Sequence, residues 1–393
     1  MSLSEWIIEK IKKEGPLSFR DFMELCLYHP QWGYYTADGD RIGPSGDFYT
    51  SPCFTSLFGE MLARQLEEMW LVLGKKEFTI VEYGAGTGIL CRDILRALEK
   101  NGPLYEGLRY YIIEKSPAMR EKERACLRSA EQTPADSLLR KIDWVDSIHD
   151  IAPIAGCILS NELIDNFSVH RVVMEDELME ILVDYEEGHG FRELLRPAPG
   201  GLKDYMEELG IGLPRGFRTE INLQALEWLK EIATALIKGW LLTIDYGYPS
   251  AELYSAKRNT GTLTCYHRHQ THHCPYLHIG GQDITAHVNF SALRHWGSSY
   301  GLEYGGFTNQ SFFLRGMGIV HHIRNMENSR MASTYKDLPG EGAEQFLRTL
   351  LLDMGGKFKM LLQSKNTPFY PLSGFRFPQP LEGSRRLVQE LHR

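Results

Sequence analysis

The chain has 393 residues, and its 43 Lys plus Arg against 51 Asp plus Glu give a formal net charge of −8 with histidine neutral. At about 150 residues per domain this length fits two or three domains or one enlarged core, and 43% hydrophobic residues exclude wholesale disorder. The acidic balance argues against nucleic acid as a partner, and no apolar stretch reaches the roughly 18 residues that a membrane span requires.

The first 75 residues are predicted to form helices and one long loop. Apolar residues fall on one face of an amphipathic helix over 4–13, and Ser18 is placed to cap a second helix. Residues 29–52 are rich in glycine, proline and aromatic residues and are predicted as a long ordered loop, a kind of segment that is often functional. Acidic residues within the first helix and seven scattered cysteines without a Cys-x-x-Cys pair indicate a cytoplasmic protein without a targeting segment.

From residue 78 onward, short apolar segments alternate with helical ones. Because strands that are apolar throughout must be covered on both faces, this alternation predicts a doubly wound, mostly parallel α/β sheet. The strands are predicted at 78–83, 110–114, 143–145, 156–160 and 240–245, with helices at 90–100 and 121–130.

An insertion separates the fourth strand from the fifth. It is predicted as an antiparallel meander at 169–174, 179–185 and 191–196, followed by a helix at 223–237. Residues 247–290 are rich in loops, Phe307 and Phe312 mark a closing strand and helix, and 343–363 is predicted as a last helix. The chain is therefore expected to divide into 1–75, 76–168, 169–238 and 239–393, of which the second and fourth segments form the core.

The strongest chemical signal is Val81-Glu-Tyr-Gly-Ala-Gly-Thr-Gly88, between the first strand and its helix. Glycines allow a tight turn, expose bare backbone to a ligand and present amide N–H groups at the positive end of the helix. A dinucleotide-binding turn would have glycine where this chain has Ile89, which disfavours a nicotinamide-dependent dehydrogenase. The spacing of Gly84, Gly86 and Gly88 resembles instead the first motif of class I methyltransferases, which bind S-adenosylmethionine. An ordinary tight connection would show the same glycines.

An acidic residue, Glu114, ends the second strand. In class I methyltransferases an acid at this place takes both ribose hydroxyls of the cofactor, a role that suits a carboxylate acceptor. Glu82, inside the glycine motif, is a further candidate contact to the cofactor. The pairing of Glu114 with the glycine motif favours a cofactor site over a purely structural turn.

The fourth strand ends in Ser160-Asn-Glu-Leu-Ile-Asp165, and ligands of a doubly wound sheet lie beyond such carboxyl ends. Asn161 lacks the two following prolines that are typical of enzymes methylating nucleobase amino groups. Paired carboxylates suit a guanidinium, which is always charged and must lose a proton when it is methylated. We predict that Glu162 and Asp165 hold and deprotonate an arginine and that Asn161 positions the acceptor or the cofactor. The alternative is that these acids only cap the following turn.

Histidines and cysteines gather in one later segment. Soft and imidazole ligands so close together could bind zinc in a metal hydrolase, but they share one loop and match no standard structural site. We predict no metal, and we consider His267 or His287 as an assisting group in the cleft. The cluster comprises Cys265, His267, His269, His272, His273 and Cys274, with His278 nearby.

Short motifs along the chain occur in the order expected of one known family. They lie at 46–51, 58–60, 81–88, 113–117, 161–165, 244–247, 261–266 and 283–290. Together they resemble the MidA family of S-adenosylmethionine-dependent methyltransferases, which includes the mitochondrial enzyme that methylates an arginine on a subunit of respiratory complex I. The resemblance covers nearly the whole chain. It implies a class I, Rossmann-like core whose N-terminal segment and insertion frame the cleft.

The resemblance also implies contacts to the cofactor. It assigns Gly84, Gly86 and Glu114 to the cofactor and implies that Gly46, Asp47 and Phe48 close over it. Asp47 would pair with the cofactor's ammonium group or order the loop, and an Asx-type turn is the alternative.

The end of the fifth strand bears on the acceptor side of the cleft. Asp245 and Tyr246 end the fifth strand and are expected to point at the same crevice, although an aspartate at a strand end can also be structural. Three residues depart from the family's usual pattern and leave the shape of the acceptor pocket open: Tyr83, Ser168 and Asn289.

The sequence thus predicts a cytoplasmic protein-arginine methyltransferase that uses S-adenosylmethionine, with a subunit of a respiratory complex as a candidate substrate. The alternative is an assembly or scaffold protein that keeps the fold without turnover, because fold alone does not imply activity. A homodimer with contacts through 312–313 or the N-terminal helix is also compatible with the sequence.

Overall fold

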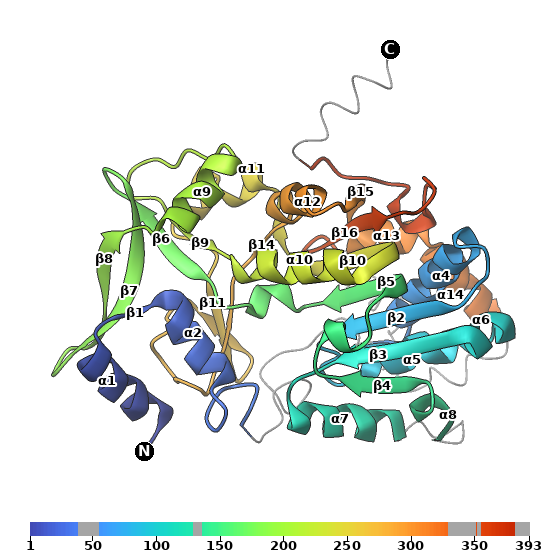
Figure 1. Cartoon of the computed structure of the whole chain (residues 1–393), viewed down its shortest axis with the longest axis horizontal. Coiled ribbons are helices and arrows are strands. Elements are labelled where there is room, and N and C mark those ends of the chain that lie inside the picture. The colour runs from blue at the N-terminus through green and yellow to red at the C-terminus, as the bar shows by residue number, and fades with distance from the viewer. Residues whose placement is uncertain (38–54, 129–135, 329–350, 352–354, 382–393) are drawn as a thin grey trace, which may run out of the picture.

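The structure, a computed structural model, describes residues 1–37, 55–128, 136–328, 351 and 355–381. It has two parts that lie side by side in Figure 1. One part holds the large central sheet, and the other holds two smaller sheets with the N-terminal helices. The arrowheads of the parallel strands in the central sheet point toward the smaller part, so the carboxyl ends of those strands meet it.

The central sheet has eight strands in the order β15-β16-β10-β5-β2-β3-β4, with β14 paired to β10. The strands β4, β3, β2, β5 and β10 are mutually parallel, whereas β16 runs antiparallel between β10 and β15. The predicted doubly wound α/β sheet is confirmed. The strands are β2 (Phe78–Tyr83), β3 (Leu108–Ile113), β4 (Ile142–Val145), β5 (Ile154–Asn161), β10 (Leu236–Tyr248), β14 (Val288–Asn289), β15 (Glu303–Asn309) and β16 (Phe358–Lys365).

The strand order reverses at β2. The chain proceeds from β2 to β3 and β4 on one side, and then crosses back to β5 and β10 on the other. Such a switch point leaves an open crevice beyond the carboxyl ends of the two strands that flank it. In this chain those strands are β2 and β5, which end at the two motifs with the clearest chemical signals, the glycine motif and Asn161–Asp165.

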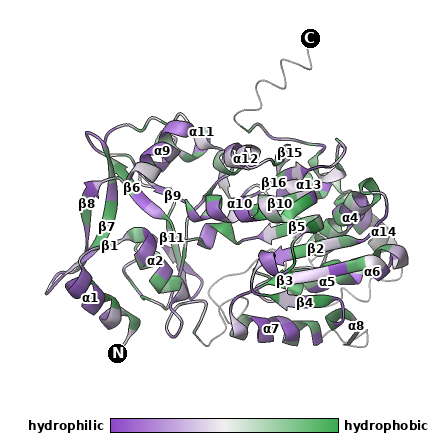
Figure 2. Cartoon of the chain, in the orientation of Figure 1, coloured by the Kyte–Doolittle hydropathy of each residue, from purple (hydrophilic) through white to green (hydrophobic). Residues whose placement is uncertain are grey.

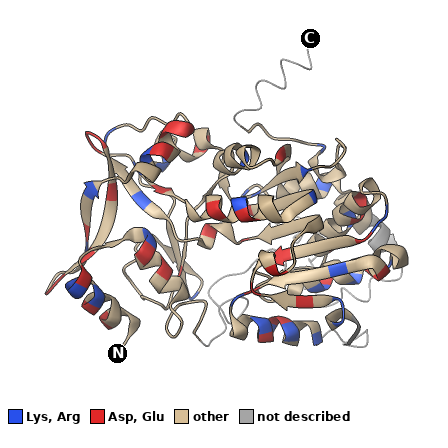
Figure 3. Cartoon of the chain, in the orientation of Figure 1, with Lys and Arg blue, Asp and Glu red and all other residues tan. Residues whose placement is uncertain are grey.

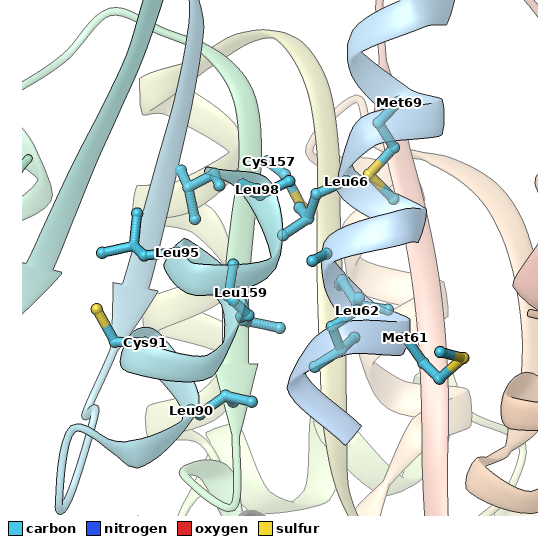
Figure 4. Close-up of a cluster of buried hydrophobic side chains, with 14 of the residues drawn as sticks. Met61, Leu62, Leu66, Met69, Leu90, Cys91, Leu95, Leu98, Cys157 and Leu159 are labelled. Atoms are coloured by element: carbon cyan, nitrogen blue, oxygen red, sulfur yellow. The ribbon is translucent and has the colours of Figure 1, made fainter. Parts of the chain in front are cut away.

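Helices cover both faces of the central sheet. Ile80 and Val81 point to opposite faces, because Ile80 belongs to the core under α4 (Leu57–Val72) and α5 (Ile89–Leu98) whereas Val81 packs with α10 (Gln224–Ala235) and α12 (Phe290–Ser299). Figure 4 shows the first of these cores, where side chains of α4 and α5 meet Cys157 and Leu159 of β5. The remaining helices beside this core are α6 (Gly102–Gly107), α7 (Pro117–Arg128), α8 (Asp136–Leu139), α13 (Gln310–Gly316) and α14 (Ile319–Asn328).

The smaller part joins the N-terminal helices to the insertion. Leu17 and Ser18 form β1, which pairs antiparallel with β7 of the meander, and Phe22 of α2 packs with Val183 and Ile284 in one core. These contacts tie three distant stretches of sequence together. The elements are α1 (Leu3–Glu14), β1 (Leu17–Ser18), α2 (Phe19–Tyr28), β6 (His170–Met174), β7 (Leu178–Glu186), β8 (Gly190–Pro197), α9 (Gly200–Glu208), β9 (Arg218–Ile221), α11 (Ser250–Leu253), β11 (Thr264–His267), β12 (Gln270–His272) and β13 (Asp283–Thr285).

Surface and interior differ as the composition predicts. Hydrophobic residues run along β7 and β10, whereas α1 and α7 carry many hydrophilic residues (Figure 2). The charges on α1 and α7 are of both signs and form no single basic face (Figure 3). Within the described residues, no helix combines the length and apolar character that crossing a membrane requires.

The prediction of a last helix over 343–363 was wrong in its second half. Residues 358–365 form β16, and 343–350 lie outside the described residues. Met360, Leu361 and Leu362 are all buried because helices cover both faces of this strand. A short apolar run of this kind has the same hydrophobic pattern in a buried strand as in a buried helix, so periodicity alone misassigned it.

Candidate active site

A cleft of about 1100 Å³ opens at the carboxyl ends of β2, β3, β4, β5 and β10. Residues from α2, α10, β11 and β13 complete its wall, so both parts of the molecule contribute to it. Its position matches the crevice that the reversal of strand order creates. The predicted glycine turn and the Asn161–Asp165 turn therefore face one shared space.

The glycine turn forms one end of the cleft. Gly84, Gly86 and Gly88 have φ of +63°, +60° and +76°, a region that residues with a side chain rarely adopt. Gly84 and Gly86 line the cleft, and Gly88 is the N-cap residue of α5. A Cβ atom on Gly88 would lie 3.1 Å from Cα of Glu123, so this glycine lets the turn pack closely on α7. The turn thus presents bare backbone at the positive end of a helix, which suits a polar ligand.

Glu114 projects into the cleft next to this turn. Its Oε1 accepts a 2.7 Å hydrogen bond from the backbone N–H of Ser116, and its carbonyl oxygen accepts one from Nε of Arg120 at 2.6 Å. Burial raises the pKa of Glu114, although the Ser116 N–H and the Arg120 charge act in the opposite direction. The side chain is therefore fixed in place, with carboxylate capacity left for a pair of hydroxyl donors.

Glu82 lies deeper in the same wall. The hydroxyl of Tyr110 donates to its Oε2 at 2.6 Å, and the side chain is almost fully buried. Burial raises the pKa of Glu82 to about 7. Because one oxygen is already bound to Tyr110, Glu82 supports the floor of the cleft as well as lining it.

The Asn161–Asp165 turn forms the other end of the cleft, and Asn161, Glu162 and Asp165 all line it. Glu162 has φ of +52°, which is uncommon for a residue with a side chain and marks local strain. Two groups hold the turn in this shape. The carbonyl of Ile244 accepts from the N–H of Glu162 at 2.9 Å, and Oδ2 of Asp245 accepts from the N–H of Ile164 at 2.8 Å.

Asp245 is therefore part of the framework. It is fully buried, it is not among the residues that line the cleft, and its second oxygen accepts from the N–H of Tyr246 at 2.9 Å. Burial raises its pKa to about 7, against the effect of these N–H donors. Both residues were expected to point into the crevice; Tyr246 does line the cleft, whereas Asp245 does not.

Acidic groups are concentrated around Asp165. This side chain is only 5% exposed, and burial together with the charges of Asp245, Asp283 and Glu162 raises its pKa well above the usual value. Asp283, on β13, lines the cleft, and its Oδ1 accepts from the hydroxyl of Tyr35 at 2.9 Å and from Nδ2 of Asn166 at 3.0 Å. Among the described residues that line the cleft, Lys115 is the sole lysine or arginine, and it follows Glu114 at the other end. The Asp165 end of the cleft is thus suited to a cation.

Tyrosines surround these acids. Tyr28 and Tyr35 stack with ring centroids 5.7 Å apart, and the hydroxyl of Tyr28 donates to the carbonyl of Asn166 at 3.0 Å. Tyr246 and Tyr266 also line the cleft. Burial first, and then the charges of Glu162 and Asp165, raise the pKa of both hydroxyl groups. Aromatic faces beside carboxylates favour a flat or bulky cation.

Sequence reasoning missed several residues of the cleft. Asp146, Ser147 and Ile148 reach it from the end of β4, and a residue at the end of a parallel strand next to the glycine turn is the signal that could have identified them. Tyr28 and Tyr35 could not be placed, because pairing and packing with distant segments bring their own segment to the acidic end.

Other predicted residues lie elsewhere. His267 is not among the residues that line the cleft; its Nδ1 is 2.8 Å from the carbonyl of Gly281, and its ring stacks on His278 at 4.1 Å. His287 is also absent from the lining, and burial lowers its pKa to about 4. Gly46, Asp47 and Phe48 lie outside the described residues. No three His, Cys, Asp or Glu side chains in the described part of the chain are arranged to hold a metal ion.

Comparison with known proteins identifies the family of this chain. A family model described as "Putative S-adenosyl-L-methionine-dependent methyltransferase" matches residues 61–308, which is more than half of the chain. The chain belongs to this family. The methyltransferase is also similar to a protein from Burkholderia thailandensis whose crystal structure contains S-adenosyl-homocysteine, with a TM-score of 0.85 and 29% identity over 96% of this chain and 95% of that one.

Relatives in animals are named for an activity. A Drosophila melanogaster protein named "Protein arginine methyltransferase NDUFAF7 homolog, mitochondrial" is 28% identical, over 95% of this chain and 88% of its own length. The Homo sapiens protein arginine methyltransferase NDUFAF7, mitochondrial, is 27% identical over 80% of this chain and 72% of its own length. These matches confirm the predicted resemblance, the class I fold and the S-adenosylmethionine-dependent methyltransferase activity. Neither the dehydrogenase nor the scaffold reading is favoured by them.

Proposed function

We propose that this methyltransferase acts on an arginine side chain of a protein. The observation that carries the proposal is the group of acids at one end of the cleft, where Asp165 and Asp283 line the wall beside Glu162, and burial together with the charges of its neighbours raises the pKa of Asp165. A guanidinium is charged at every physiological pH, and its donors form a fork that fits carboxylates. The names of the animal relatives support the same acceptor.

The cofactor end is proposed from the residues that the sequence singled out. S-adenosylmethionine supplies an activated methyl group on a sulfonium. Gly84 and Gly86 would admit it against bare backbone, Gly88 would set the shape of the turn, and Glu114 would accept from its ribose hydroxyls. Glu82 supports this end from below. Closure by Gly46, Asp47 and Phe48 stays a prediction.

The acceptor end is proposed to work by alignment and charge. Glu162 and Asp165 would hold the guanidinium and take the proton that a methylated nitrogen must lose, and Asn161 would fix the position of the acceptor nitrogen. His267 as an assisting group stays a prediction, and its absence from the lining lowers its priority for mutagenesis. We propose further that 1–75 and 169–238 act as the two segments that frame the acceptor side, next to a core of 76–168 and 239–393.

Transfer of a tritiated methyl group tests the proposal. The full chain, labelled S-adenosylmethionine and an extract from a strain lacking the gene would yield a labelled protein, and mass spectrometry of its peptides would place the methyl group on arginine. Glu162→Gln and Asp165→Asn should each reduce transfer at least about a hundredfold, because each loses a charge-assisted contact to the acceptor. Glu207→Gln, an exposed acid on α9 outside the cleft, is the control with the same loss of charge. Full transfer in both cleft variants, or a methyl group on another residue type, would contradict the proposal.

Substrate, compartment and assembly remain proposals. We propose a protein substrate, with a subunit of a respiratory complex as the first candidate, and a cytoplasmic enzyme. The described cysteines are all free, which fits a reducing compartment, whereas the animal relatives are named mitochondrial. Cell fractionation decides the compartment, and sedimentation of the purified chain decides whether it forms the proposed homodimer.

A further inference from the structure

The carboxyl group of Asp165 differs from the other two buried aspartates in its hydrogen bonds. Asp245 accepts from three backbone N–H groups, those of Leu163, Ile164 and Tyr246. Oδ1 of Asp283 accepts from the Tyr35 hydroxyl, from Nδ2 of Asn166 and from its own neighbour's N–H, that of Ile284. Oδ1 of Asp165 is buried and has no hydrogen-bond partner among the described residues. Donors stabilise a carboxylate charge, so hydrogen bonds favour the ionised form at Asp245 and Asp283 more than at Oδ1 of Asp165.

Three negative charges so close together in a buried site repel one another, and a proton on one member relieves the repulsion. Asp165 is the member whose Oδ1 has no donor among the described residues. Burial first, and then the charges of Asp245, Asp283 and Glu162, raise its pKa against the effect of the Asn166 backbone N–H. The ionisable groups that face it come from every element packed around it. They are Glu162 of the same turn, Asp245 and Tyr246 of β10, Asp283 of β13, Tyr266 of β11, Tyr28 of α2, and Tyr35, which follows α2.

We propose that Asp165 carries a proton in the empty acceptor site and releases it to solvent when a guanidinium enters, so that acceptor binding is an exchange of one cation for another. The inference rests on the proposed function. The incoming positive charge relieves the repulsion between the acids, as the proton did before. The newly ionised Asp165 then pairs with the guanidinium. A neutral isostere of arginine brings no charge and cannot drive the exchange.

The exchange has a consequence for turnover. When a guanidinium nitrogen is methylated, the S–CH₃ bond of the sulfonium breaks as the N–CH₃ bond forms, and neutral S-adenosyl-homocysteine leaves. One N–H bond of the guanidinium also breaks, so the product keeps a single positive charge and one proton is left over. The ionised Asp165 is placed to take that proton, because it lines the cleft at the acceptor end. The methylated cation would then face the protonated site again, which holds it less tightly than the ionised site held the substrate. Product release and resetting of the site become one step.

Infrared spectroscopy of the full chain saturated with S-adenosyl-homocysteine tests whether Asp165 carries a proton before an acceptor binds. A protonated carboxyl group has its own C=O stretch, and we expect Asp165→Asn to lose one such band at neutral pH relative to the unchanged chain. N-acetyl-arginine amide should abolish the same band in the unchanged chain, and N-acetyl-citrulline amide should leave it. Glu123→Gln is the matched control: Glu123 is also buried with a raised pKa, but it lies outside the cleft, so its variant loses a different band and keeps the arginine-sensitive one.

Calorimetry in two buffers with different ionisation enthalpies tests whether binding of the acceptor releases that proton. Binding of N-acetyl-arginine amide to the chain with S-adenosyl-homocysteine should release close to one proton at pH 6 to 7, and Asp165→Asn should release none. If arginine binds without proton release, or if the band is unchanged in Asp165→Asn, this inference is wrong while the proposed function stands. If S-adenosyl-homocysteine binds but the arginine probe does not, the proposed acceptor is what fails. Asparagine has the shape of a protonated aspartate, so we expect Asp165→Asn to fold. If it does not fold, Asp165→Glu is the second variant and should shift the arginine-sensitive band. An unshifted band in Asp165→Glu would refute the assignment.

Discussion

Gly88 offers the sharpest test of how the cofactor turn is built. Gly88→Ala should destabilise the protein for two separable reasons. An alanine at φ of +76° costs about 1 kcal/mol relative to glycine, and its Cβ would lie 3.1 Å from Cα and 3.2 Å from the carbonyl oxygen of Glu123, backbone atoms that cannot turn aside. Overpacking of this kind costs a further 1–2 kcal/mol or so, which brings the total to about 2–3 kcal/mol.

Gly210→Ala is the matched control for that variant. Gly210 has φ of +63°, but nothing lies within 4 Å of its added Cβ, so this variant should lose only the conformational part, about 1 kcal/mol. Urea unfolding measures both losses, and binding of S-adenosyl-homocysteine measures the turn itself. Relief of the crowding should displace the turn and weaken binding about tenfold, the equivalent of about 1.4 kcal/mol, in Gly88→Ala alone. Equal stability losses and equal affinities in the two variants would refute the view that close packing on α7 shapes the turn.

Three further changes test other parts of the cleft. Glu114→Gln should weaken S-adenosyl-homocysteine at least about tenfold, because a charge-assisted acceptor for hydroxyl donors is lost; unchanged affinity in calorimetry would remove its proposed role. Asp245→Asn should lower kcat more than it weakens the cofactor, because it loosens the strained turn at Glu162, and an equal effect on both would argue for a general loss of folding. The pKa of Glu123 is raised to about 8 by burial first and by Glu114 second, so the folded state binds its proton more tightly than the unfolded state does. Its stabilising effect is complete below pH 4.5 and is lost as the pH rises through about 8, a difference of at most about 5 kcal/mol. Glu123→Gln should therefore flatten the dependence of unfolding free energy on pH between those limits, and an unchanged slope would show that Glu123 does not titrate there.

The fold was predictable where hydrophobic pattern and element length agree. β2 begins and ends at the predicted residues 78 and 83, because an apolar run stops abruptly at a glycine turn. The pattern failed at 358–365, where burial on both faces removes the alternation that distinguishes strand from helix. It also could not show that β16 runs antiparallel between β10 and β15, since strand order depends on pairing between distant segments.

The site was predictable from chemistry at strand ends and not beyond. Glu114 and Asp165 were found because a parallel sheet collects the ends of its strands in one place. Asp283 and Tyr35 reach the same cleft from the smaller part of the molecule, and their 2.9 Å hydrogen bond joins positions that no local pattern relates. His267 was chosen because histidines are conspicuous in the sequence, but its ring stacks on His278 and it is not among the residues that line the cleft.

The position of β16 bears on how the protein is made. Among the described strands, β15 pairs only with β16. Leu362 of β16 lies opposite Leu242 of β10, which the ribosome synthesises far earlier. Until β16 emerges, the nascent chain exposes the open edge of β10 together with apolar side chains that have no cover. Such pairing between distant segments slows folding, so this enzyme should depend on chaperones during translation more than a sheet built from neighbouring strands would.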